Sequence, residues 1–129
     1  MIGNEALAGS RPATQAARHA IFADAVEIIA AEYARPIRIE EVSRRVATSP
    51  RQLQRVFADV GGRGFRAHLR AVRMARATEL LATTDVPVKE IATRVGYDDP
   101  SQFSKAFKRT YGVSPSRMRD TRRDSGPES

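Results

Sequence analysis

The sequence of 129 residues contains no cysteine and no long apolar run. The absence of cysteine excludes disulfide bonds, thiolate metal sites and a cysteine nucleophile, and it fits a reducing compartment. No window approaches the roughly 18 apolar residues that a membrane-spanning helix needs. Residues 1–9 have neither the basic patch nor the apolar stretch of a secretory signal. We therefore expect a cytoplasmic protein without a membrane segment.

Side chains that carry catalytic or metal chemistry are also sparse. His19 and His68 stand without cysteine or acidic residues at ligand spacing, so no metal site is predicted. Residues 61–64 are rich in glycine but follow no predicted strand, unlike a phosphate-binding loop. Asp98 and Asp99 fit a turn and a helix cap better than a catalytic pair. Because no nucleophile–base pair is visible either, we predict that the protein is not an enzyme and binds no cofactor.

The basic charge is concentrated in one part of the chain. The formal net charge is +7, but residues 1–37 hold three Lys or Arg against four acidic residues. Residues 38–123 hold nineteen Lys or Arg against nine acidic residues, a net charge of +10. A positive field of this kind attracts a polyanion, for which nucleic acid is the natural candidate. The alternative at this point is a basic surface that serves only solubility.

Two segments fifty residues apart share one pattern. Residues 49–57 and 99–107 each begin with an N-cap residue, followed by Pro at the first helical position and Gln at the third. We expect the cap side chain to accept a hydrogen bond from the backbone N–H of the Gln, and the Gln side-chain oxygen to accept one from the cap N–H. Apolar residues then recur at the same offsets in both segments. The pattern predicts one short, polar-faced helix built twice.

Each copy follows a second, shorter helical segment. Residues 39–46 precede the first copy, and a matching segment precedes the second at an offset of 49. Ser43 and Ala92 occupy the position at which the two helices of a helix-turn-helix touch, where a small side chain is needed. The turn also needs a residue that tolerates a left-handed backbone, which Gly96 supplies and Ala47 supplies less comfortably. Two such motifs in tandem are a far more specific signal than one.

The predicted fold class is all-α, with two helix-turn-helix subdomains joined by a long linker helix and about seven helices in total. A last short helix is expected after the second motif. The predicted boundaries are a flexible N-terminal segment (1–14), a two-motif domain (15–119) and a disordered tail (120–129). Within the domain, the first motif is predicted at 39–59, the linker helix at 64–82 and the second motif at 88–109.

Outward residues on the second helix of each motif have the chemistry to read DNA bases. Arginine can donate twice to guanine O6 and N7, and glutamine can pair with adenine N6 and N7, each contact giving about 1–3 kcal/mol of discrimination. The shorter side chains of the second motif are less decisive, so the first motif should contribute more specificity. The predicted base contacts are Arg51, Gln54 and Arg55 in the first motif, and Ser101, Gln102, Ser104 and Lys105 in the second. The predicted phosphate contacts, which position the protein without reading sequence, are Arg45, Ser49, Gln52, Lys108 and Arg109.

The predicted linker helix adds an argument from length. Eighteen helical residues make a rod of roughly 27 Å, and consecutive major-groove faces on one side of B-DNA lie about 34 Å apart. A rod of this length could set two reading helices about one helical turn apart. We therefore expect one chain to bind double-stranded DNA as a monomer.

The linker and the second motif carry further patterned residues. They comprise the pattern Arg73-x-x-Arg76-Ala77-x-x-Leu80-Leu81, the runs 94–97, 103–109 and 111–115, and Arg119. Together with the tandem motif, these residues resemble the AraC/XylS family of transcriptional regulators over about residues 20–119. The resemblance implies a two-subdomain helical unit that binds promoter DNA, usually activates transcription and contacts RNA polymerase. It also implies that the outward residues of both reading helices contact bases.

The sequence departs from the family pattern at Ala47, where Gly is usual, and at Pro100, a position sometimes used for contact. Most members also carry a separate ligand-binding or dimerisation domain. Because the first motif begins near residue 39, the chain resembles either the compact single-domain members or a part of a larger protein.

Several residues keep two interpretations at this level. Arg73 could contact phosphate or form a semi-buried ion pair, and the stripe that it forms with Arg66 and Arg70 could be solvated or contact DNA. Gln52 and Gln102 could read bases, although capping explains them without DNA. Residues 112–119 are expected to close the core of the second subdomain.

The favoured function is a sequence-specific DNA-binding transcription regulator, with activation the more expected sign. The alternatives are a nonspecific, architectural DNA-binding protein and an interaction module that docks on polymerase without touching DNA.

Overall fold

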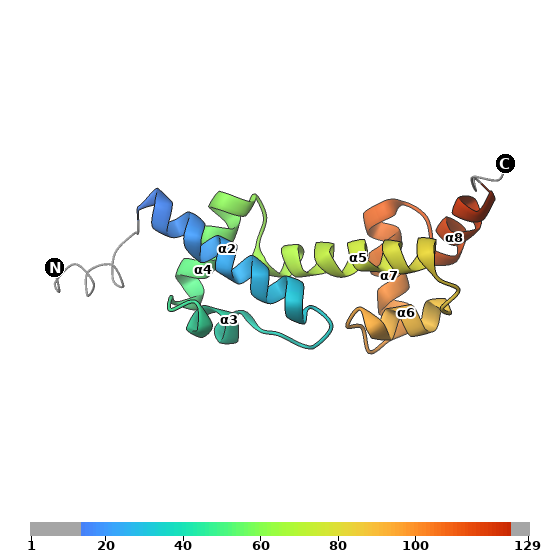
Figure 1. Cartoon of the computed structure of the whole chain (residues 1–129), viewed down its shortest axis with the longest axis horizontal. Coiled ribbons are helices and arrows are strands. Elements are labelled where there is room, and N and C mark those ends of the chain that lie inside the picture. Colours follow the sequence, from blue (N-terminus) through green and yellow to red (C-terminus); the bar gives the residue numbers. More distant parts are fainter. Residues whose placement is uncertain (1–13, 125–129) are drawn as a thin grey trace. The chain divides into compact units, whose positions relative to one another are not determined.

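The computed structural model describes residues 14–124, and the regular structure within that range is helical (Figure 1). Its helices are α2 (Gln15–Glu32), α3 (Ile39–Arg45), α4 (Pro50–Gly61), α5 (Phe65–Thr83), α6 (Val88–Arg94), α7 (Pro100–Tyr111) and α8 (Pro115–Asp124). The predicted all-α class is therefore confirmed, with seven helices and no strand over the described residues. None of these helices is both long and apolar enough to cross a bilayer.

The described part of the chain begins just before α2 and ends with α8. Residues 1–13 lie outside the described part of the chain, and the hydroxyl of Thr14 accepts a hydrogen bond from the Ala17 N–H in the first turn of α2. At the other end, α8 continues to Asp124. Residues 120–124 are thus helical, and the predicted disordered tail was wrong for them, because the helix that begins at Pro115 is not interrupted by Gly or Pro before residue 126.

The chain divides into two compact units. The first unit contains α2, α3, α4 and the start of α5, as far as Leu69. The second contains the rest of α5, from Arg70, together with α6, α7 and α8. It also includes Tyr33–Pro36, which follow α2 in the sequence.

Aromatic side chains form the centre of the first unit, where α2 packs on α4 and α3 packs on both. Phe57 is fully buried and meets Phe22 and Phe65 edge-on, at ring-centroid distances of 5.1 and 5.5 Å. The ring of His68 lies against Phe57 at 5.4 Å, and its Nε2 is buried without a hydrogen-bond partner among the described residues. Burial lowers the pKa of His68, and the positive charge of Arg63 lowers it further.

The second unit has its own core. Buried residues of α5 pack against buried residues of α6 and α7; they are Met74, Ala77, Leu81, Ile91, Ala92, Val95, Phe103, Ala106 and Phe107. Tyr97 and Phe103 meet edge-on at 5.6 Å between ring centroids. Burying large side chains of this kind contributes about 1.5–3 kcal/mol each, which lets a unit of this size fold.

Two arginines stabilise the second unit by binding backbone carbonyls. Arg73 donates from Nε to the Tyr33 carbonyl at 2.8 Å and from Nη2 to the Arg35 carbonyl at 3.1 Å. It also lies over the ring of Tyr97, 5.7 Å from the centroid. These contacts give Arg73 a structural role that neither sequence interpretation, phosphate contact or ion pair, had anticipated.

Arg119 is the other of these arginines, and it is buried. Its guanidinium donates to the carbonyls of Leu81 and Thr84 at 3.3 and 3.1 Å, where α5 ends. The last carbonyls of a helix lack partners within it, so a buried cation there satisfies them. This agrees with the expectation that residues 112–119 close the core of the second unit.

The duplication extends beyond the motif that the sequence shows. Gly62 and Gly112 both end a reading helix with φ of +82°. Two residues later, the carbonyls of Gly64 and Ser114 accept from the N–H groups of His68 and Met118, opening α5 and α8. The offset of fifty therefore persists from the start of each reading helix into the helix that follows it.

Candidate nucleic-acid interface

Each unit contains a helix-turn-helix: α3 and α4 in the first, α6 and α7 in the second. Ser43 and Ala92 are fully buried, as expected for the small residue between the helices. In each turn one residue has a left-handed backbone, Ala47 with φ of +58° and Gly96 with φ of +103°. Both predictions about the motif are thus confirmed by the geometry.

The caps of the reading helices agree only partly with expectation. The Ser49 hydroxyl accepts from the Gln52 N–H at 3.1 Å, as predicted. The Asp99 carboxylate instead accepts from Ser101 N–H at 2.8 Å, one residue earlier than predicted. Within residues 14–124, neither Gln side chain accepts a hydrogen bond from the cap N–H, so the predicted reciprocal capping box was wrong. Carboxylate caps commonly bond the N–H two residues on, because the short Asp side chain reaches it in an Asx turn.

On α4 the amphipathic spacing separates buried and outward residues. Leu53, Val56 and Phe57 are buried, whereas the predicted base contacts Arg51, Gln54 and Arg55 are all exposed. Gln54 differs from the two arginines, because its side-chain oxygen accepts from the Phe65 N–H at 3.2 Å.

On α7 the same division holds with different outward chemistry. Phe103, Ala106 and Phe107 are buried. Of the predicted base contacts, Ser101, Gln102 and Lys105 are exposed and Ser104 is half-buried. At the offset of fifty, Ser101 stands where α4 has Arg51, Ser104 where it has Gln54, and Lys105 where it has Arg55.

The predicted phosphate contacts have unequal surroundings. Lys108 and Arg109 are exposed in the last turn of α7. Ser49 is exposed and Gln52 half-buried, and the Ser49 oxygen is occupied by its capping bond.

Arg45 is held by acidic residues of its own unit. Its guanidinium pairs with Glu32 at 2.7 Å and with Glu41 at 3.4 Å. The hydrogen bond to Glu32, together with the charges of Glu32 and Glu41, raises the pKa of Arg45. A cation already paired twice gains less from a phosphate than a free one. Glu41 stands four residues before Arg45, a spacing from which this ion pair could have been predicted, whereas Glu32 is distant in the sequence.

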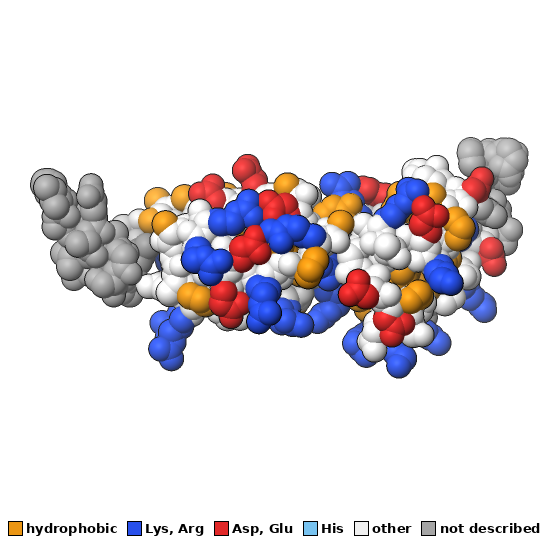
Figure 2. All heavy atoms as spheres, turned by 90° about the horizontal axis from the view of Figure 1, so that it is seen from below, with side chains coloured by type: hydrophobic (Ala, Val, Ile, Leu, Met, Phe, Trp, Pro, Cys, Tyr) orange, Lys and Arg blue, Asp and Glu red, His pale blue; other side chains and the backbone are white. Residues whose placement is uncertain are grey.

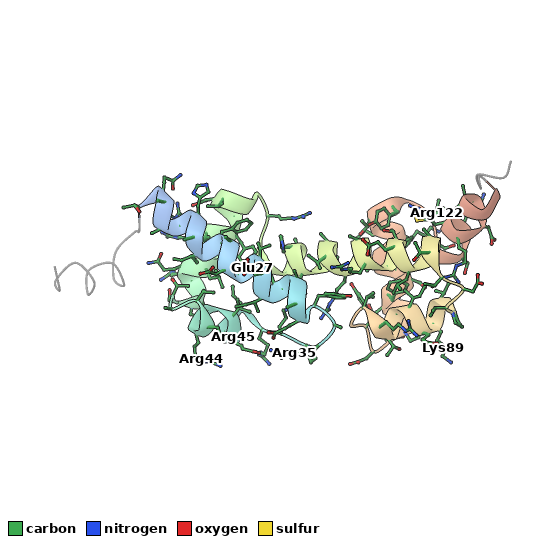
Figure 3. All side chains as sticks on the ribbon, viewed as in Figure 1. Glu27, Arg35, Arg44, Arg45, Lys89 and Arg122 are labelled. Carbon is green, nitrogen blue, oxygen red and sulfur yellow. The ribbon has the colours of Figure 1, made fainter. Side chains whose placement is uncertain are left out.

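Arg44 is a cation that the sequence reasoning missed. It lies beside Arg45 near the C-terminal end of α3 (Figure 3), is exposed, and forms no ion pair within residues 14–124. In the second unit Arg94 repeats the pairing seen at Arg45, since it bonds Glu90 at 2.7 Å. The turn preceding each reading helix is therefore flanked by one paired arginine, and in the first unit also by an unpaired one.

Charges of both signs share the surface of each unit. Figure 2 shows Lys and Arg side chains interspersed with Asp and Glu on the face seen from below. The excess of basic residues counted in the sequence therefore does not form a uniformly positive surface on this face. What each helix can bind depends on the identity of its individual outward residues. Within the described residues, no group of three or more His, Cys, Asp or Glu side chains could hold a metal ion.

Two helix-turn-helix units on one chain, each presenting a capped helix with polar outward residues, define the architecture of a DNA-binding regulator. The family model described as "Helix-turn-helix domain" matches residues 42–121. This model is of the AraC type, and it matches more than half of the chain, so the chain belongs to the AraC-type helix-turn-helix family of transcriptional regulators.

Curated relatives share the sequence of this region. The chain is 35% identical over 85 residues to the HTH-type transcriptional regulator GlxA of Rhizobium meliloti. This alignment covers 66% of this chain and 26% of GlxA. The chain is also 35% identical over 95 residues to the regulatory protein PocR of Salmonella typhimurium, covering 74% of this chain and 31% of PocR. The chain thus spans about a quarter to a third of the length of these relatives.

Solved structures share the fold. The C-terminal domain of AraT, a response regulator from Geobacillus stearothermophilus, superimposes with a TM-score of 0.76 at 39% identity, covering 79% of this chain and 85% of that domain. The DNA-binding domain of AdpA, a global transcriptional factor solved in complex with a target DNA, superimposes with a TM-score of 0.78 at 28% identity. That match covers 83% of this chain and 96% of the AdpA domain.

Proposed function

We propose that this protein binds specific double-stranded promoter DNA through α4 and α7, each placed in the major groove. The observation that carries the proposal is the exposed pair Arg51 and Arg55 on a capped helix whose opposite face is buried. Arginine in such a position is the most common reader of guanine. The AdpA domain, similar over most of this chain, has been solved on its target DNA, which supports the proposal.

In the second unit we assign base contact to Ser101, Gln102, Ser104 and Lys105. Their shorter or single-donor side chains discriminate less sharply than paired arginine contacts. Phosphate contact is assigned to Lys108, Arg109, Ser49 and Gln52, whereas the ion pairs of Arg45 make it a weaker candidate. Specificity should therefore be greater in the half-site read by the first unit.

Because one chain carries two reading helices, we propose that it binds as a monomer to two unlike half-sites. Selection of bound sequences from a random duplex library tests this directly. Two different half-sites centred about ten base pairs apart are expected. Enrichment of one palindrome would instead indicate a dimer, and no enrichment at about 150 mM salt, where nonspecific binding is weak, would refute sequence-specific binding.

The role of individual arginines is tested on the selected site. Arg55→Ala should reduce discrimination at one base pair by about 1–3 kcal/mol, or roughly 5- to 150-fold. Lys108→Ala is the matched control, since loss of a phosphate contact should weaken all sequences about equally. If Arg55→Ala also weakened all sequences equally, its assignment to a base would be wrong.

We further propose that bound protein activates transcription by contacting RNA polymerase, as the family resemblance implies. Transcription in vitro from a promoter carrying the selected site should rise when the protein is added. A fall would indicate a repressor, and an unchanged transcript level with the site fully occupied would refute activation at that promoter.

A further inference from the structure

Gln54 lies on the outward face of α4 but bonds to its own chain. Its Oε1 accepts a hydrogen bond from the backbone N–H of Phe65, the first residue of α5, at 3.2 Å. A backbone N–H can only donate, so the oxygen of the amide, and not its nitrogen, must face Phe65. The orientation of this glutamine is therefore fixed by its partner.

The bond compensates for a cap that α5 lacks. The first N–H groups of a helix have no partner within it, and a side chain of the preceding residue usually supplies one. Gly64 precedes α5 and has no side chain to offer. Gln54, reaching across from α4, supplies an acceptor to the first of these N–H groups, that of Phe65.

The second unit meets the same need in another way. At the equivalent positions, fifty residues on, Ser114 replaces Gly64 and its hydroxyl accepts from the Arg117 N–H at 3.1 Å. Pro115 replaces Phe65 and has no N–H to satisfy. Ser104, at the position equivalent to Gln54, is therefore not needed to accept a hydrogen bond from the first residue of α8.

We infer that Gln54 is a positioning residue, which caps α5 and ties it to α4, and that the sequence preference of the first unit is set by Arg51 and Arg55. The inference rests on the proposed DNA binding. A glutamine that pairs with adenine must direct Oε1 and Nε2 together at the base. Turning both toward DNA would take the acceptor away from Phe65.

The second unit supplies the substitutions for a test in the full chain. Gln54→Ser removes the cap, and adding Gly64→Ser transplants the serine cap of the second unit. A Cβ on Gly64 would meet only the Gln54 Oε1, at 3.2 Å, an atom that the first substitution removes. The double variant Gln54→Ser/Gly64→Ala is the matched control, because it adds the Cβ without the hydroxyl.

Thermal unfolding measures the capping role. Gln54→Ser should lower the melting temperature by about 4–8 °C, the shift expected for the loss of one cap in a unit of this size. Gln54→Ser/Gly64→Ser should recover at least half of that loss, and the alanine control should recover none. An unchanged melting temperature for Gln54→Ser would overturn the inference.

Selection from a random duplex library measures the reading role. The inference requires the serine-capped double variant to enrich the same sequence as the wild type. A variant with restored melting but altered preference at one or two base pairs would show that Gln54 reads bases and would overturn it. A wild-type chain that enriches no sequence would refute the proposed function instead, and the melting temperatures would still decide the capping role.

Gln54→Glu gives an independent check. It keeps a side-chain acceptor near the positive end of the α5 dipole, so the melting temperature should hold. It removes the N–H donors and adds negative charge, so affinity should fall equally for all sequences while the preference stays the same. A changed preference with unchanged melting would again assign Gln54 to a base.

Discussion

Gly96→Ala should unfold the second unit under conditions in which the wild type is folded. Gly96 has φ of +103°, beyond the left-handed region near +57° that an L residue can adopt at moderate cost. A Cβ there would lie 2.9 Å from the Tyr33 carbonyl oxygen and 2.8 Å from the Arg73 Nε. These are the two atoms that form the 2.8 Å hydrogen bond between Arg73 and Tyr33, so the methyl group would have to break that bond or move the backbone.

The expected loss follows from these two effects. A left-handed backbone costs an L residue about 1–2 kcal/mol, and a hydrogen bond from a charged donor is worth about 1.5–3 kcal/mol. Their sum, about 2.5–5 kcal/mol, approaches the whole stability of a small domain. The melting transition of the second unit should therefore fall by more than about 10 °C.

Urea and thermal unfolding followed by circular dichroism measure the loss, and amide hydrogen exchange assigns it to α6 and α7. Ala47→Gly is the matched control at the same position of the first motif. Ala47 has φ of +58°, near the left-handed minimum, so relief of strain and gain of unfolded-state entropy should nearly cancel within about 1 kcal/mol. A loss below about 1 kcal/mol for Gly96→Ala would refute the reasoning.

Three further predictions concern side chains with defined surroundings. Because burial lowers the pKa of His68 in the folded chain, the unfolded chain takes up the proton at a higher pH, and stability should fall as the pH drops below about 6.5. His68→Met, which places at this position the residue found at the equivalent Met118, should flatten that part of the plot of unfolding free energy in urea against pH. A profile identical to that of the wild type would contradict it. Arg119→Met removes the buried donor to the end of α5 and should cost about 2–4 kcal/mol in urea unfolding; a cost below about 0.5 kcal/mol would show that water replaces the guanidinium. On selected DNA, Arg44→Ala should weaken binding and reduce the salt slope by about 1, whereas Arg45→Ala should mainly lower stability because the ion pairs from Arg45 to Glu32 and Glu41 are lost. Equal losses of affinity would show that these ion pairs open on DNA.

Much of the fold could be predicted because its signals are local. The spacing of apolar residues, the Pro after each cap and the small residues at 43 and 92 each depend on neighbours within one or two helical turns. The reading helices are amphipathic over twelve residues each, long enough for the period to be unambiguous. The end of α8 was missed because its last turns are polar and carry little periodic signal.

The site was predicted less completely, because availability for binding depends on partners far away in sequence. Arg45 was predicted to contact phosphate, yet it is already paired with Glu32, which lies on another helix. Gln54 was predicted to contact a base, yet its side-chain oxygen accepts a hydrogen bond from the N–H of Phe65, the first residue of the next helix. Arg73 looked like part of a basic stripe, yet it bonds carbonyls forty residues earlier.

The sequence by itself determined that this is an all-α protein with a duplicated helix-turn-helix, and which residues of each reading helix face outward. Those properties follow from backbone preference and hydrophobic period, which act over a few residues. Only the tertiary structure decided which outward polar groups are already engaged, as Arg45 and Gln54 are. A hydrogen bond or an ion pair is made to whatever group the fold brings within about 3–4 Å, and separation along the chain does not specify that neighbour.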